Sequence, residues 1–301
     1  MFTLIKEETN EYTTELLDLR NDFVFKTFFS IKRNNHLLLS FINAILEETV
    51  TSVEIINANL DMMHIADKAS VMDLRIATET REQINIEMQV SGHRALPERM
   101  LMYWAKMYAS QDEKGSSGYK QLRKVTQILI ADFKLLPKSH FHSKFQLIDK
   151  ENLTLYSEHI EFHVIELPKV SRNLHNRSKE LEKWLLFLKG NTKTKEEIAM
   201  ESSTFKEAFE EIERLSQDPK TRALAISREK FLRDQNQREL EARIDGKEEG
   251  IILGIEQGIE QGALQAEEKM VLTMHAKGNT AQAIADLTDI PLERVKKIIN
   301  K

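Results

Sequence analysis

The chain contains no cysteine and no long apolar run in its 301 residues. The absence of cysteine excludes disulfide bonds and thiolate metal sites, and it fits a reducing compartment, so we expect a cytoplasmic protein. The longest apolar stretches, such as "QILIADF" and "WLLFL", are far shorter than the ~20 residues needed to cross a bilayer. The start, "MFTLIKEETNEYTTE", is too polar and acidic for a signal peptide. We therefore expect no membrane segment.

Several common catalytic motifs are also missing. The chain has neither the phosphate-binding loop pattern nor the glycine fingerprint of dinucleotide-binding folds, and no Ser-His-Asp arrangement is recognisable. Histidines alternate along two strand-like segments, His140 with His142 and His159 with His163, the latter pair flanking Glu161. Such residues could bind zinc, but alternating polar side chains more often form the solvent-exposed face of a strand.

The chain has no overall excess of positive charge, since its net charge is −5 at pH 7. Taken alone, this value argues against a nucleic-acid partner. The charges are unevenly distributed, however. Residues 94–124 hold seven basic side chains against three acidic ones, whereas residues 196–218 hold eight acidic side chains against two basic ones. The basic segment could lie along a phosphate backbone, or both segments could simply be solvated helix faces.

The most informative feature is a pair of carboxylates in two short runs with strand-like alternation. Asp73 lies in "VMDLRIAT", Glu87 lies in "INIEMQV", and the polar segment "ETREQ" between them suits a hairpin turn. Antiparallel pairing about this turn joins residues whose numbers sum to about 160, so Asp73 would face Glu87. Facing like charges are destabilising unless a cation or a proton lies between them. The pair is therefore either a solvated acidic face or a divalent metal site, with Gln89 placed to orient a water or touch a phosphate.

An Asp, a hairpin and then Glu-x-Lys form the core motif of the PD-(D/E)xK nuclease superfamily, and here Gln89 stands at the lysine position. Within the superfamily the chain resembles the recombination-promoting nuclease and transposase family, in which Glu-x-Gln is the usual form. The resemblance covers roughly residues 20–170 and extends more weakly to the C-terminus. Met72 stands where the superfamily motif has proline. The likeness is carried by the segments "NDFVFKTFFS", "LLLSFINAIL", "MDLRIAT", "INIEMQV" and "ERMLMYWAKMYASQ".

The resemblance implies an α/β fold of the restriction-endonuclease type, in which helices flank a mixed sheet, followed by an all-helical C-terminal region. It also implies a magnesium-dependent DNA endonuclease associated with transposition or recombination. Asp73 and Glu87 would bind Mg²⁺ or Mn²⁺, which prefer oxygen ligands and activate water for phosphodiester hydrolysis. Gln89 would position the attacking water, although it lacks the positive charge of the superfamily lysine.

The resemblance suggests further site residues on two helices. An acid from the first helix often completes such metal sites, and Asp22 is the first candidate for it, followed by Glu47 or Glu48. The helix after the hairpin offers three candidate contacts to DNA phosphates, namely Arg99, Tyr103 and Lys106.

The order of the predicted elements supports the same fold class independently. The segment "NDFVFKTFFSIKRNNHLLLSFINAILEE" has helical spacing of apolar residues, with Asn21 or Asp22 as its N-cap. The segment "LPERMLMYWAKMYASQ" is a second helix, with Pro97 near its first turn. The runs "KVTQILIADFKL", "FHSKFQLID" and "HIEFHVIEL" have the length and alternation of strands. This order predicts an α/β sandwich with a mixed sheet.

We divide the chain into four parts. Residues 1–172 form the nuclease-like core, 173–245 a charged helical region, 246–268 a helix or linker with regular glycines, and 269–301 a helix-turn-helix-like tail. In the tail, Thr280 can cap one helix and Pro291 can begin the next.

The third part has a glycine at every fourth residue, at Gly246, Gly250, Gly254, Gly258 and Gly262. Each glycine costs a helix about 1 kcal/mol relative to alanine. Such spacing would, however, let another backbone approach one side of a helix closely. A self-associating helix, which predicts a homo-oligomer, and a flexible linker are equally good interpretations.

A second hypothesis belongs to a different functional class. The chain could be a non-catalytic, oligomeric DNA-binding or regulatory protein that uses its C-terminal helices on a degenerate nuclease scaffold. Magnesium-dependent nicking of DNA, compared with DNA binding in the presence of a chelator, distinguishes this hypothesis from the nuclease.

Overall fold

A computed structural model describes residues 15–56, 74–92, 95–112, 119–171 and 180–300 of the chain. The chain divides into two compact units, residues 1–233 and 234–301. Each unit is described by itself. Asp73 lies outside the described residues, so the structure does not place the first of the two predicted metal ligands.

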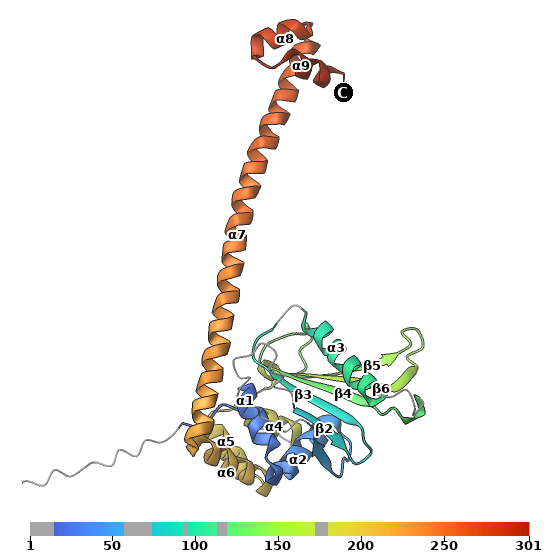
Figure 1. The fold of residues 1–301 in the computed structure, drawn as a ribbon, viewed down its shortest axis with the longest axis vertical. Helices are drawn as coiled ribbons and strands as arrows, with labels where there is room; N and C mark the ends of the chain where they lie inside the picture. The colour runs from blue at the N-terminus through green and yellow to red at the C-terminus, as the bar shows by residue number, and fades with distance from the viewer. Residues whose placement is uncertain (1–14, 57–73, 93–94, 113–118, 172–179, 301) are drawn as a thin grey trace, which may run out of the picture. The chain divides into compact units, whose positions relative to one another are not determined.

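The first unit is built on a mixed sheet, which within the described residues has six strands in the order β1-β2-β3-β4-β6-β5 (Figure 1). Strands β3, β4 and β6 are parallel, whereas β1 with β2, β2 with β3 and β5 with β6 are antiparallel. With its flanking helices, this sheet confirms the predicted α/β fold of the restriction-endonuclease type. The strands are β1 Val53–Ile55, β2 Leu74–Thr78, β3 Gln83–Gln89, β4 Val125–Ala131, β5 His142–Ile148 and β6 Leu155–Glu166.

The hairpin of β2 and β3 has the register predicted from the sequence. Leu74 lies opposite Ile86 and Ile76 lies opposite Ile84, so paired residue numbers sum to 160 as predicted. All four of these apolar side chains are buried on one face of the sheet. A slip by one residue would move them to the other face, so their burial fixes this register.

Helices from both ends of the first unit cover that apolar face. They are α1 Asp22–Ser30, α2 Asn35–Leu46, α4 Glu180–Lys189, α5 Thr192–Ala199 and α6 Ser203–Gln217. Asn21 is the N-cap of α1, and its side chain accepts hydrogen bonds from the N–H groups of Phe23 and Val24. Trp184 of α4 packs against Phe41 of α2 at 5.6 Å between ring centroids. These helices and the sheet therefore share one hydrophobic core.

Helix α3, Leu96–Ala109, covers the opposite face of the sheet (Figure 1). Its residues Leu96 and Met100 are buried against Leu129 of β4 and Val164 of β6 in a second, smaller cluster. The polar positions of β3 lie on this face, because they alternate with Ile84 and Ile86. The structure thus places Glu87 and Gln89 under α3.

Glu161 and His163 of β6 do not lie on a solvent-exposed face, contrary to the more common interpretation of their alternation. Glu161 and His163 are each 1% exposed. His142 of β5 bonds to His163 at 2.8 Å, and His163 bonds to Glu161 at 2.8 Å. His159 instead contacts the hydroxyl of Tyr108, so the histidines do not converge on one point. Among the described residues, no group of three His, Asp or Glu side chains is arranged to hold a metal ion.

The second unit contains the larger part of α7, Pro219–Ala276, followed by α8 Ala281–Thr288 and α9 Leu292–Ile299. Val271, Ile284 and Val295, one from each helix, form a small buried core. As predicted, Thr280 caps α8 by accepting a hydrogen bond from the N–H of Ala283 at 3.2 Å. Among the helices that the structure describes, none combines the length and apolar composition needed to cross a membrane.

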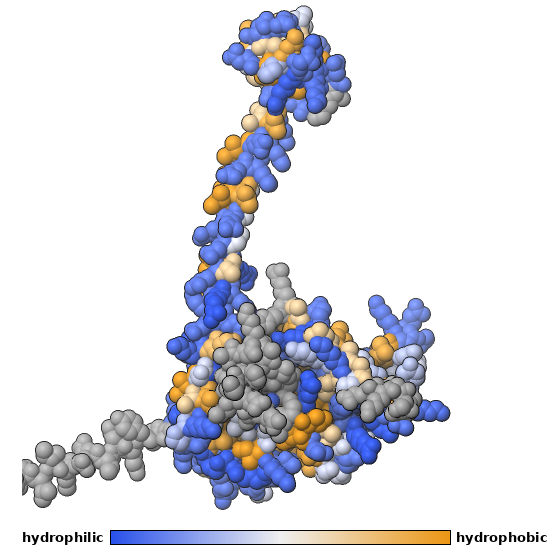
Figure 2. All heavy atoms as spheres, viewed as in Figure 1, coloured by the Kyte–Doolittle hydropathy of each residue, from blue (hydrophilic) through white to orange (hydrophobic). Residues whose placement is uncertain are grey.

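The five regularly spaced glycines all lie within α7, and a Cβ built on any of them meets no atom within 4 Å. Apolar side chains near them, including Ile251, Ile255 and Ile259, are more than half exposed. Figure 2 shows orange apolar patches along α7 between hydrophilic side chains. Self-association of this helix stays a prediction.

Candidate functional site

The candidate site begins at the carboxyl end of β3. This strand pairs with β4 along its whole length and with β2 over residues 83–86. Glu87 lies opposite Leu129 of β4, and the residue is 7% exposed. Gln89, two residues further along the same face, is partly buried. An ionised carboxylate at this depth requires a cationic partner or strong hydrogen bonds.

Arg99 of α3 contacts both residues. Its Nη2 donates to Oε1 of Glu87 in a short ion pair and to Oε1 of Gln89 at 3.0 Å. Gln89 is oriented for this contact, because its Nε2 donates to the carbonyl oxygen of Ser91 at 3.1 Å. The arrangement places one guanidinium between the carboxylate and the amide that the sequence singles out.

The sequence of α3 explains how Arg99 reaches that position. Leu96 and Met100 are buried against the sheet and flank Arg99 in the first turn of the helix. They fix the rotation of the helix, so the arginine points toward the end of β3 while remaining partly buried. Tyr103 and Lys106 follow Arg99 at spacings of four and three residues, which places them near the same side of α3. Tyr103 is partly buried and Lys106 is exposed.

Asp73 lies outside the described residues, but the hairpin is described up to the neighbouring residue, Leu74. The pairs from Leu74 to Ala77 follow one uninterrupted register. The pairing of Asp73 with Glu87 stays a prediction.

Asp22, the predicted third acid, has an arginine of its own. It lies in the first turn of α1, which packs against β3. Its carboxylate oxygens accept bonds from Nε of Arg228 at 2.9 and 3.1 Å, and the N–H of Phe23 donates to it at 2.8 Å. Both side chains of the ion pair are about one-tenth exposed, at 13% for Asp22 and 10% for Arg228. The structure therefore shows Asp22 joined to the start of α7.

The alternative acids lie at the end of α2. Glu47 is its C-cap with a positive φ of 57°, and both Glu47 and Glu48 are exposed. Glu48 has a distant ion pair with Lys124, at 3.7 Å. Neither position has the burial expected of a carboxylate that completes an enclosed metal site.

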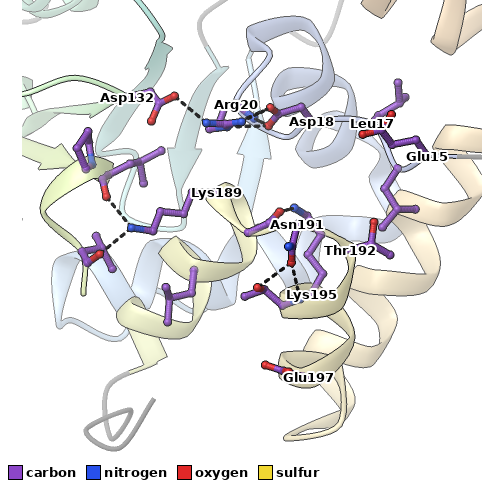
Figure 3. A pocket seen from close by; sticks show the side chains of 17 residues that line it. Glu15, Leu17, Asp18, Arg20, Asp132, Lys189, Asn191, Thr192, Lys195 and Glu197 are labelled. Atoms are coloured by element: carbon purple, nitrogen blue, oxygen red, sulfur yellow. Dashed lines mark hydrogen bonds and ion pairs between the residues drawn. The ribbon is translucent and has the colours of Figure 1, made fainter. Parts of the chain in front are cut away.

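A cavity of about 860 Å³ lies beyond the ends of the parallel strands (Figure 3). Asp132, which follows β4, and Leu167, which follows β6, both line it. Three of its charged side chains are paired with one another: Arg20 donates to Asp18 and, at 3.0 Å, to Asp132. Lys195 contacts the carbonyl oxygen of Gly190. Glu87 and Gln89 do not line this cavity, so it is separate from the predicted metal site.

Two buried charged groups, one in this cavity and one on the sheet, show how burial changes a pKa. Burial lowers the pKa of the Lys195 ammonium to about 8. Across the sheet, burial raises the pKa of the Glu161 carboxyl, but hydrogen bonds from His163 and Lys144 outweigh it and hold that pKa at about 2.

Sequence reasoning missed the arginines as partners of the candidate acids. Arg99 was expected to contact a DNA phosphate, and the structure shows it on Glu87 and Gln89. Arg99 lies twelve residues after Glu87, in the first turn of the next helix, and this short separation could have indicated that the two residues are in contact. Arg228 gave no such indication, because 206 residues separate it from Asp22.

The mixed sheet, the antiparallel hairpin and the Glu-x-Gln pair beneath α3 define a protein with a restriction-endonuclease-like fold. A family model described as PD-(D/E)XK nuclease family transposase matches residues 19–242. The match covers most of the chain, and the protein therefore belongs to this family. Comparison with the curated proteins and with the solved structures gave no significant match.

Proposed function

We propose that the protein is a metal-dependent DNA endonuclease that hydrolyses phosphodiester bonds during transposition or recombination. The observation that carries the proposal is the buried Glu87 carboxylate at the end of a hairpin whose register would bring Asp73 opposite it. Membership of the nuclease and transposase family supports the same class of reaction. The absence of cysteine favours the cytoplasm as its compartment.

The residues at this point suit a divalent metal ion. Glu87 and the proposed partner Asp73 are oxygen ligands of the kind that Mg²⁺ and Mn²⁺ prefer. The Arg99 guanidinium already occupies the neighbourhood of Glu87, so the site accepts positive charge. Asp22 is the proposed third acid, and it would have to exchange Arg228 for that role.

A divalent metal ion held by Asp73 and Glu87 would polarise an oxygen of the scissile phosphate and would lower the pKa of an attacking water. Gln89 orients that water through its amide. Arg99, Tyr103 and Lys106 contact phosphates of the DNA from α3. The helices of the second unit support DNA binding and association into a homo-oligomer.

Nicking of supercoiled plasmid by the full chain tests the proposal. Activity should require Mg²⁺ or Mn²⁺ and disappear with a chelator. Asp73→Ala and Glu87→Ala should each abolish it, and the double variant should be no worse than either one, because groups that act as a unit are not additive. Glu98→Ala, an exposed acid on α3, is the matched control. Full activity in either site variant would refute the metal site.

The second candidate function is a non-catalytic DNA-binding or regulatory protein. It is favoured by one observation, namely that Arg99 already pairs with both Glu87 and Gln89, the residues that the metal site would use. A protein of this class should bind DNA equally well with and without a chelator and should leave plasmid intact at every metal concentration.

A further inference from the structure

Arg99 occupies a position that would conflict with a loaded metal site. Its Nη2 donates to Glu87, a proposed metal ligand, and at 3.0 Å to Gln89, the proposed water-orienting amide. A guanidinium and a divalent ion carry charge of the same sign, so they repel each other when both approach one carboxylate in a small, partly buried site. The two cations therefore compete for Glu87.

We infer that the Arg99 guanidinium is the built-in counter-cation of this site, which holds Glu87 and Gln89 in the metal-free protein and is exchanged for the metal ion. The inference rests on the proposed metal-dependent function and goes beyond it, because it assigns Arg99 a role before DNA is bound. Removing the cationic partner of a buried carboxylate is strongly destabilising. The Arg99 guanidinium therefore stabilises the fold when no metal ion is bound.

The position of Arg99 suits exchange. Arg99 lies on a different element from Glu87, namely α3, and its side chain is 30% exposed, whereas that of Glu87 is 9% exposed. The guanidinium can therefore move toward solvent while the carboxylate stays in place. Once displaced, it is free to meet a phosphate, so the contact seen here and the predicted DNA contact belong to successive states.

The exchange lowers the apparent affinity for metal. If the guanidinium occupies Glu87 for about nine-tenths of the time, the apparent Kd is about ten times the intrinsic value. Removing the guanidinium should therefore tighten metal binding, although it removes a favourable interaction from the metal-free protein.

Calorimetric titration of Mn²⁺ into the full chain tests this without reference to cleavage. Arg99→Met should bind Mn²⁺ about tenfold more tightly than wild type, and Arg99→Lys, which keeps the charge but loses the planar fork, should show a smaller gain. Arg123→Met is the control, because this exposed arginine donates to the carbonyl oxygens of Lys120 and Leu122. It should leave the affinity unchanged.

Thermal unfolding provides a second readout. Without metal, Arg99→Met should melt below wild type, and Mn²⁺ should raise its Tm by more than it raises that of wild type, because binding to the native state stabilises in proportion to affinity. If Arg99→Met does not fold, Arg99→Lys carries the test, and an affinity equal to wild type overturns the inference.

The results separate the two proposals. Equal or weaker Mn²⁺ binding by Arg99→Met, with binding still abolished by Glu87→Gln, overturns the exchange and leaves the metal site standing. Mn²⁺ binding that Glu87→Gln does not affect in any variant refutes the metal site, and the exchange with it.

Discussion

Two buried glutamates on opposite faces of one sheet have very different surroundings. Glu161 of β6 accepts hydrogen bonds or ion pairs from His163, Lys144 and Lys124, which come from the sheet and its margin. Glu87 of β3 is held by an arginine on a covering helix, and the same arginine holds Gln89. A carboxylate fixed by cations of the sheet and its margin serves the fold, whereas one paired with a partly exposed arginine of a covering helix can serve as a ligand.

The largest expected effect separates these two glutamates directly. Glu87→Gln should reduce plasmid cleavage at least about a thousandfold while leaving the free energy of unfolding nearly unchanged. Glu161→Gln should leave cleavage nearly unchanged and should lower the free energy of unfolding by about 3 kcal/mol, because it removes one member of a buried charged network. Cleavage assays and urea unfolding measure both effects. Exposed Glu158→Gln serves as the control on β6. A loss of cleavage in Glu161→Gln without a loss of stability would contradict the purely structural role assigned to Glu161.

The next effect concerns Gln89. If its amide orients the attacking water, Gln89→Ala should slow single-turnover cleavage about a hundredfold with little change in metal affinity. Gln89→Lys restores the superfamily residue and should retain activity, since its charge lies where negative charge develops. Wild-type rates in Gln89→Ala would remove the assigned role. Matched effects on metal affinity and rate would instead make Gln89 a ligand.

The pH dependence of stability sharpens the account of Glu161. Its pKa is lowered from 4.5 to about 2 in the folded protein, so the folded state binds this proton less readily than the unfolded state. Its contribution is therefore fully present above about pH 4.5 and is lost as the pH falls toward about 2. The stability difference between wild type and Glu161→Gln, measured by urea unfolding, should shrink over that range. A constant difference would contradict the assigned network.

The smallest expected effect lies outside the first unit. In a chain that lacks residues 246–301, Glu87→Gln should still reduce cleavage and Glu161→Gln should still reduce stability, because both glutamates lie in the first unit. The deletion should lower the oligomeric state and weaken DNA binding at least about tenfold through lost multivalency. Light scattering and DNA titration are the measurements. An unchanged mass after truncation would exclude self-association through the glycine-bearing part of α7.

Much of the sheet followed from the sequence, because strand alternation and a short turn determine a register. The pairing of Leu74 with Ile86 is a local feature and was predicted correctly, and the helix cap is at Asn21, one of the two residues predicted for it. The burial of Glu161 was not predicted, since alternation shows that two faces differ but not which face is covered. A second layer of helices over the sheet buries polar positions that alternation alone suggests are wet.

The candidate site was also predictable only in part, because some of its contacts depend on how helices pack against the sheet. Glu87 and Gln89 were found from spacing and resemblance, because both lie on one strand. Their partner Arg99 comes from a helix whose rotation depends on the packing of Leu96 and Met100. The Asp22–Arg228 pair depends on how the start of α7 packs against α1, which no local pattern encodes.

The most direct test of the central claim is a crystal structure of the full chain soaked in Mn²⁺, with anomalous data collected for the ion. We predict an anomalous peak between the carboxylates of Asp73 and Glu87, with the Arg99 guanidinium displaced from Glu87. The absence of a peak there, with Arg99 still on Glu87 at a Mn²⁺ concentration that supports cleavage, would contradict this claim.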